Sequence, residues 1–131
     1  MDEAMIVVST GHSAAGMNFV DLLLKKGLAF VVLVHSEEER EQLQTLGAFP
    51  VRYIQETEGM QQTRPEYMVT NAFVFENNLP QCCQDIQLCH SWYPQHLYVV
   101  SSNKAPVGLV YKGLGATYVI HSQSGNVSFL L

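Results

Sequence analysis

Short apolar runs alternate along this chain with segments whose apolar residues recur at helical spacing. The first run, Met5–Ser9, is followed by the helical pattern of Ala14–Lys26 and by a glycine that ends it. The next run, Leu28–Val34, leads into a helix that Ser36 caps and that ends at Leu46. Such an alternation indicates a parallel sheet covered on both faces, because parallel neighbours need crossover connections.

The same alternation continues along the chain. Further strands are expected at 51–55, 72–75, 97–101 and 117–121, further helices at 80–92 and 105–114, and no clear pattern at 56–68. The fold class is therefore α/β: a three-layer, doubly wound, Rossmann-like parallel sheet of about six strands in the order 3-2-1-4-5-6. We expect one Rossmann-like nucleotide-binding domain over residues 1–122 and a C-terminal tail over residues 123–131.

Composition excludes several classes of protein. A chain of 131 residues that is 47% hydrophobic and 15% charged suits one globular domain. Its 12 acidic and 7 basic residues give a net charge of −5, and the basic residues are scattered, so we expect no nucleic-acid partner. The first residues are acidic, and no apolar run approaches the roughly 18 residues of a membrane span. We expect a cytoplasmic protein without direct membrane insertion.

The turn Gly11–Gly16 reads Gly-His-Ser-Ala-Ala-Gly, which is the dinucleotide fingerprint G-x-G-x-x-G with Ser13 at the second glycine. The first glycine permits a sharp turn off the strand, and the last lets the helix pack closely on the sheet. Ser13 narrows the approach of a pyrophosphate but adds a hydroxyl donor. The helix N-terminus presents unpaired N–H groups to anions whatever the side chains are. Two interpretations stay open: weakened nucleotide binding, or a turn that keeps only its shape.

Other candidate ligand contacts follow the remaining strands. An acidic residue is expected about 20 positions after the fingerprint. His35 stands there instead, and Glu37 is near enough to substitute if the helix begins favourably. Glu76 follows the fourth strand, next to the point where the strand order reverses, and Ser101 to Asn103 end the fifth. We assign cofactor binding to Gly11, His12, Ser13, Ala14, Gly16, His35, Ser36, Glu56 and Glu76.

No catalytic or metal-binding constellation stands out. Cys82, Cys89 and His90 would lie near one another on a helix, but a zinc site needs four ligands, usually with a C-x-x-C knuckle. We expect reduced cysteines that act as small apolar residues; redox sensing would require exposed thiols. The sequence holds no Tyr-x-x-x-Lys pair and no G-x-S-x-G elbow. The protein is therefore expected to be non-enzymatic, with no catalytic residue and no metal.

Three segments resemble the N-terminal lobe of the regulator-of-potassium-conductance family, also called the TrkA-N domain. They are IVVSTGHSAAGMNFVDLLLKKG (6–27), VVLVHSEEEREQLQTLGA (31–48) and GLGATYVIHS (113–122). The resemblance implies a regulatory Rossmann domain that binds NAD(H) or another adenine nucleotide and acts by ligand-dependent conformational change or assembly. It also implies a homodimer, with a potassium channel or transporter membrane subunit as a further partner.

The sequence departs from that family at three positions that face the ligand. The family usually has Gly-Asp after the third strand, where this chain has Gln55-Glu56, and an acid at the end of the second strand, where it has His35. Ser13 is the third departure. The resemblance therefore implies a nucleotide that binds weakly or not at all.

Two alternatives come from other classes of protein. One is an NAD(P)-dependent reductase of the NmrA-like type, which looks similar in the glycine turn and in the stretch VLVHSEEEREQLQTLGA (32–48). The other is a pure interaction module whose crevice is filled by side chains. A reductase should oxidise NAD(P)H, a sensor should bind a nucleotide without turnover, and an interaction module should do neither.

Overall fold

The structure is a computed structural model that describes residues 4–11, 13–34, 36–47, 51–53, 68–76, 78–101 and 108–122. The elements are, in chain order, β1 (Ala4–Ser9), α1 (Ala14–Lys26), β2 (Phe30–Val34), α2 (Glu37–Leu46), β3 (Val51–Tyr53), β4 (Met68–Phe75), α3 (Leu79–His90), β5 (His96–Ser101), α4 (Gly108–Leu114) and β6 (Tyr118–His121).

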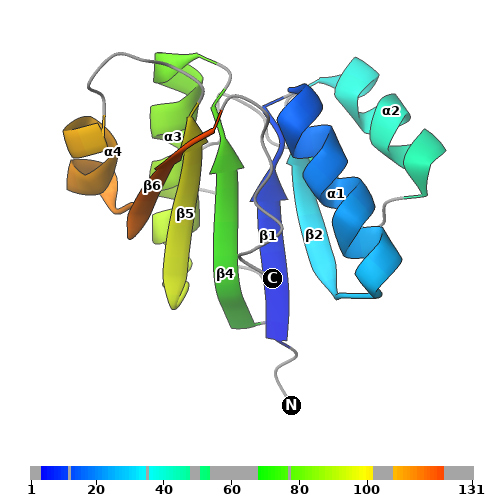
Figure 1. Cartoon of the computed structure of the whole chain (residues 1–131), viewed down its shortest axis with the longest axis horizontal. Coiled ribbons are helices and arrows are strands. Elements are labelled where there is room, and N and C mark those ends of the chain that lie inside the picture. Colours follow the sequence, from blue (N-terminus) through cyan, green and yellow to red (C-terminus); the bar gives the residue numbers. More distant parts are fainter. Residues whose placement is uncertain are drawn as a thin grey trace.

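The six described strands form one parallel sheet in the order β3-β2-β1-β4-β5-β6. Figure 1 shows β2, β1, β4, β5 and β6 of this order side by side. Val8 of β1 lies beside Val32 of β2 on one side and beside Phe73 of β4 on the other. The predicted order 3-2-1-4-5-6 is confirmed. The order reverses between β1 and β4, so the ends of these two strands flank the expected ligand crevice.

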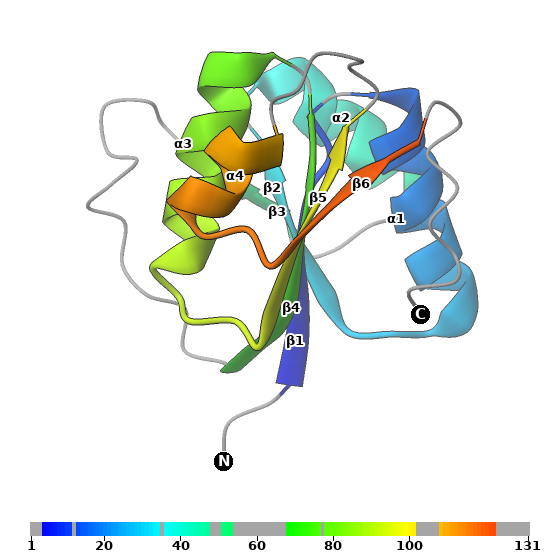
Figure 2. The same ribbon diagram turned by 60° about the vertical axis from the view of Figure 1, so that its left-hand side comes forward.

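Helices cover the sheet from both sides, as Figure 2 shows in a view almost along the sheet. On one side α1 and α2 pack on the sheet, and Phe19 and Leu43 are buried in that layer of the core. On the other side lie α3 and α4, which bury Ile86 and Tyr111. The predicted three-layer arrangement is therefore present, with one apolar cluster on each face of the sheet.

Glycine sets the boundary between α1 and the second strand. Gly27 has a φ of 67°, and the N–H of Leu28 donates to Leu23 O at 3.2 Å, which closes the helix end. Leu28 therefore belongs to the end of the helix, and β2 begins at Phe30, two residues later than predicted. Apolar character alone does not distinguish a residue that closes a helix from the first residue of a strand.

The fourth strand is longer than its apolar core suggests. It begins at Met68, four residues before the predicted start, and its register with β1 shifts between Met5 and Ile6. The hydroxyl of Thr70 donates to Met5 O at 3.2 Å, and Thr70 O accepts from the N–H of Gln95 at 2.9 Å. Polar residues in this irregular stretch hide the strand from an argument based on apolar runs.

The remaining predicted elements agree with the structure to within a few residues. The predicted helix 80–92 is α3, which begins at Leu79 and ends at His90. Residues 54–55 and 105–107 of the predicted third strand and fourth helix lie outside the described residues, as do 56–67 of the unclear polar stretch.

Candidate functional site

The turn between β1 and α1 is tied together by one serine. Gly11 has a φ of 60°, as the sharp turn requires. The Oγ of Ser13 accepts from the N–H of Gly16 at 3.0 Å and donates to Thr10 O at 2.7 Å, so this side chain caps α1. The hydroxyl hydrogen of Ser13, expected as a donor to a phosphate, is thus used within the turn.

Gly16 brings α1 against the end of β1. A Cβ at this position would lie 2.4 Å from Thr10 O and 2.6 Å from Thr10 Cα, both backbone atoms. The last glycine of the fingerprint therefore has the predicted role of close packing between helix and strand.

The first turn of α1 keeps two free donors. Ser13 O accepts from Met17 and Ser13 Oγ from Gly16, but neither Ala14 nor Ala15 has a hydrogen-bond acceptor for its N–H among the described residues. These are the first two positions of the helix, where N–H groups have no partner within the helix. Together with the helix dipole they favour a bound anion.

Ala14 and Ala15 border a hollow of about 210 Å³ at the carboxyl edge of the sheet. Ser13 completes the side that α1 supplies. The strands supply the other side, with Phe75 and Glu76 at the end of β4, Val100 of β5, and Ser122 after β6. The hollow therefore lies beside the point where the strand order reverses, as expected for a ligand crevice.

Glu76 is the charged group of this hollow. Its Oε1 accepts from Ser101 Oγ at 2.9 Å, and its Oε2 accepts from the hydroxyl of Tyr111. Tyr111 is fully buried, and burial together with its hydrogen bond to Glu76 raises the pKa of Tyr111 above its ordinary value. The tyrosine thus stays protonated at neutral pH and acts as a donor to the carboxylate.

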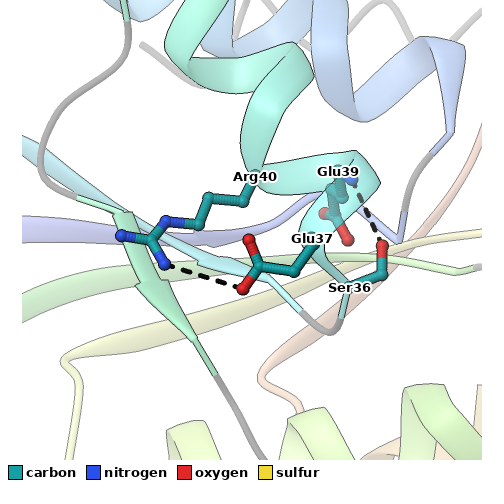
Figure 3. Close-up of polar contacts among 4 residues, drawn as sticks. All are labelled: Ser36, Glu37, Glu39 and Arg40. Atoms are coloured by element: carbon teal, nitrogen blue, oxygen red, sulfur yellow. Dashed lines mark hydrogen bonds and ion pairs between the residues drawn. The ribbon is translucent and has the colours of Figure 1, made fainter.

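The N-terminus of α2 is the second part of the predicted site. Ser36 caps it by accepting from the N–H of Glu39 at 3.2 Å (Figure 3). The side chain of Glu37, considered above as a substitute for the ribose-binding acid, is 69% exposed and lies 3.7 Å from the guanidinium of Arg40. Helix α2 therefore begins in a register that pairs Glu37 with Arg40 at the surface.

Glu39, which faces β1, is an acid that the sequence did not indicate as part of the site. Glu39 is only 2% exposed, and its Oε1 accepts from the hydroxyl of buried Thr10 at the end of β1. The pattern Ser-x-x-Glu at 36–39 is a capping box that marks such a glutamate in the first turn of a helix. It does not by itself indicate that the side chain is buried against another element.

The structure brings Ser13, Ala14 and Glu76 to one hollow, with Gly11 and Gly16 shaping the turn beside it. Ser36 instead caps α2 and does not line this hollow. Other predicted contacts lie outside the described residues: His12, His35, Glu56, Ser102 and Asn103.

The three cysteines of α3 differ in how deeply they are buried. Cys82 and Cys89 are buried in the core and Cys83 is half-buried. Burial, with Glu76 and Asp85 nearby, raises the pKa of Cys82 to about 12, and burial also raises the pKa of Cys89. Over the described ranges, no group of three or more His, Cys, Asp or Glu side chains is arranged to hold a metal ion.

No helix within the described part of the chain is both long and apolar enough to cross a membrane.

Among solved structures, the chain is similar to the TrkA-N domain of the inner membrane protein ybaL from Escherichia coli, with a TM-score of 0.63 and 14% identity over 98% of this chain and 93% of that one. It is also similar to the NAD(P)-binding domain of an exopolyphosphatase-related protein from Archaeoglobus fulgidus, with a TM-score of 0.63 and 17% identity over 89% of this chain and 86% of that one. No protein-family model and no curated protein matches the sequence. These similarities show that the chain has the Rossmann-like fold of these two domains.

Proposed function

We propose that this protein is a regulatory, non-enzymatic domain that binds an adenine nucleotide in the hollow at the carboxyl edge of its sheet. The observation that supports this best is the pair of free N–H groups of Ala14 and Ala15 beside that hollow. A phosphate at this helix end would satisfy both donors and the helix dipole. The second solved domain is described as NAD(P)-binding, which makes NAD(H) a first ligand to test.

The binding is proposed to be weak. Ser13 occupies the position of the glycine that lets the backbone approach a pyrophosphate, and its hydroxyl is used for capping. The ligand is therefore held by backbone N–H groups and by Glu76, with no described basic side chain at the hollow.

Thermal unfolding of the purified chain with NAD, NADH, NADPH, ATP, ADP and AMP, each near millimolar, tests this proposal. A nucleotide at about a hundred times its dissociation constant adds about 2.7 kcal/mol to the free energy of unfolding, a shift of several degrees in a domain of this size. We expect a shift with at least one nucleotide and no turnover of NAD(P)H. No shift with any of them would contradict the proposal and favour the interaction module.

A proline at the first position of α1 tests where the phosphate binds. Ala14→Pro removes one of the two free N–H groups, while a helix accepts proline there and the extended backbone of Ser13 (φ −100°, ψ 154°) suits the residue before a proline. The matched control is Glu37→Pro, the same change after the similarly extended Ser36 of α2. We expect Ala14→Pro to remove the ligand-dependent shift and Glu37→Pro to keep it. An unchanged shift in Ala14→Pro would place the phosphate elsewhere.

We also propose that the domain pairs as a homodimer and acts on a membrane subunit such as that of a potassium channel or transporter. Two observations support this: α4 exposes Leu109 (84%) and Val110 (48%), and the TrkA-N domain with the same fold belongs to an inner membrane protein. Light scattering with and without the nucleotide tests the dimer. A monomer under both conditions would contradict it.

A further inference from the structure

Glu76 is fixed at its backbone and at both carboxylate oxygens. Its N–H donates to Val100 O at 3.0 Å, Ser101 donates to Oε1 at 2.9 Å, and Tyr111 donates to Oε2. These partners come from β5 and α4, so two elements hold the side chain that β4 presents to the hollow. A charged acceptor held in this way loses little freedom when a ligand binds.

Tyr111 makes the more unusual of these contacts. Its side chain is fully buried in the core between the sheet and α3, among apolar residues such as Ile86 and Leu97. A buried hydroxyl needs a partner, and the hydroxyl of Tyr111 donates to the carboxylate at the rim of the hollow. The core position of Tyr111 therefore determines where Oε2 lies.

The carboxylate retains acceptor capacity for a ligand. An ionised carboxylate offers about four lone-pair positions, and the two described side-chain bonds use one on each oxygen. A second phosphate next to Glu76 would be repelled, whereas hydroxyl groups would donate to the free positions. The hollow thus presents donors for an anion at the end of α1 and acceptors for hydroxyl groups at Glu76.

We propose that Glu76 selects phosphate-bearing ligands that carry free hydroxyl groups on the attached sugar, and that Tyr111 is the residue that positions Glu76. This inference rests on the proposed nucleotide binding, and it adds which nucleotides the hollow prefers. Tyr111 acts through the carboxylate and does not itself line the hollow.

Two ligands that differ only in the sugar hydroxyls test the inference by isothermal titration calorimetry. They are adenosine 5′-monophosphate and 2′,3′-dideoxyadenosine 5′-monophosphate. A hydrogen bond to a charged group contributes more to the binding free energy than one between neutral groups. We therefore expect the dideoxy compound to bind at least about tenfold more weakly. Equal affinities would overturn the inference while leaving the proposed function intact, and binding of neither compound or of any other nucleotide would overturn both.

Variants of two tyrosines test the positioning role. Tyr111→Phe removes only the hydroxyl, and we expect it to weaken binding of the hydroxylated nucleotide several-fold with no change for the dideoxy compound. Tyr118→Phe, at a tyrosine that is 48% exposed on β6, is the matched control and should change neither affinity. If the role of Tyr111 is purely structural, Tyr111→Phe should weaken the binding of both compounds alike, and this result would overturn the positioning role of Tyr111.

Ser101→Ala provides a second comparison if Tyr111→Phe does not fold. It removes the hydrogen bond on the other carboxylate oxygen, at Oε1. The preference for adenosine 5′-monophosphate over the dideoxy compound, expressed as the ratio of their affinities, should fall as it does in Tyr111→Phe. An unchanged ratio in this variant would show that the position of Glu76 does not determine selectivity.

Discussion

Gly16 is a residue at which the fold leaves no space for a side chain. A Cβ there would meet backbone atoms of Thr10 at 2.4 and 2.6 Å, and backbone cannot rotate away as a side chain can. We therefore expect Gly16→Ala to push α1 away from β1 and to lower the free energy of unfolding by about 1–3 kcal/mol, as overpacked sites do. Urea unfolding measures the change.

The control for this substitution is another helical glycine. Gly113 of α4 has no atom within 4 Å of an added Cβ, so Gly113→Ala should be neutral or stabilise the protein by up to about 1 kcal/mol. Equal stability of Gly16→Ala and the parent protein would show that the helix adjusts without cost and would contradict the close approach.

The glycines and the buried acids differ in how far the sequence predicts them. Gly11 and Gly16 follow from the spacing of the fingerprint: Gly11 has the positive φ of a sharp turn, and Gly16 has the close approach between helix and strand. No motif predicts the burial of Glu39 and Asp85. Both are buried at the end of β1, where Thr10 donates a hydrogen bond to Glu39 and Ser9 donates one to Asp85. Each pairing joins positions far apart in the chain, so no local pattern indicates it.

At the scale of elements, α3 carries all three thiols and turns them inward to different extents. Cys82 and Cys89 are buried, whereas Cys83 is half-buried. Because burial raises the pKa of Cys82 to about 12, hardly any thiolate forms near neutral pH. Helix α3 therefore packs Cys82 and Cys89 into the apolar core, which agrees with the expectation that the cysteines act as small apolar residues.

Thiol labelling tests this description of α3. In the native protein we expect a disulfide reagent at about pH 8 to react with Cys83 at most, and with all three cysteines only after unfolding in guanidinium. The variant Cys83→Ser should then show no fast labelling. Rapid labelling of Cys82 or Cys89 in the folded protein would contradict their burial and would reopen the redox interpretation.

Helix boundaries were predictable where a capping residue stands next to the apolar pattern of the helix. Helix α1 spans Ala14–Lys26 and ends at Gly27 as predicted, and α2 begins after its predicted cap Ser36 and ends at Gly47. The capping role of Ser13 was not predicted. The start of α3 was predicted one residue late because its cap, Asn78, stands before Leu79 and Pro80 and accepts from the N–H of Gln81. Apolar spacing locates the body of a helix, and the capping side chain fixes its first residue.

At the scale of the whole molecule, the strand order was predictable because few topologies suit alternating strands and helices. Parallel neighbours need right-handed crossovers, and a reversal of order then places helices on both faces. The crevice follows from that topology and was predicted beside Glu76, which lines the observed hollow. The hydrogen bond between Tyr111 and Glu76 at this hollow was not predictable, because Tyr111 lies on a helix 35 positions further along the chain.

The buried thiols and Tyr111 also determine how stability changes with pH. Folding raises the pKa of Cys82 from 9.0 to about 12 and raises the pKa values of Cys89 and Tyr111, mainly through burial. Well below pH 9 these groups are protonated in both the folded and the unfolded state, so their titration does not change the free energy of unfolding. Above pH 9 the unfolded chain releases protons that the folded protein retains, and the free energy of unfolding falls as pH rises.

We therefore expect stability that is level between about pH 7 and 8.5 and that declines above about pH 9, by up to roughly 1.4 kcal/mol per pH unit for each buried group that titrates only in the unfolded chain. Urea unfolding across this range measures the slope. In a variant with Cys82→Ala and Cys89→Ala the decline should be shallower, whatever the absolute stability of that variant, because two of the titrating groups are gone. An equal slope in variant and parent would show that other groups dominate the alkaline unfolding, and a free energy of unfolding that stays constant to about pH 11 would contradict the burial of all three.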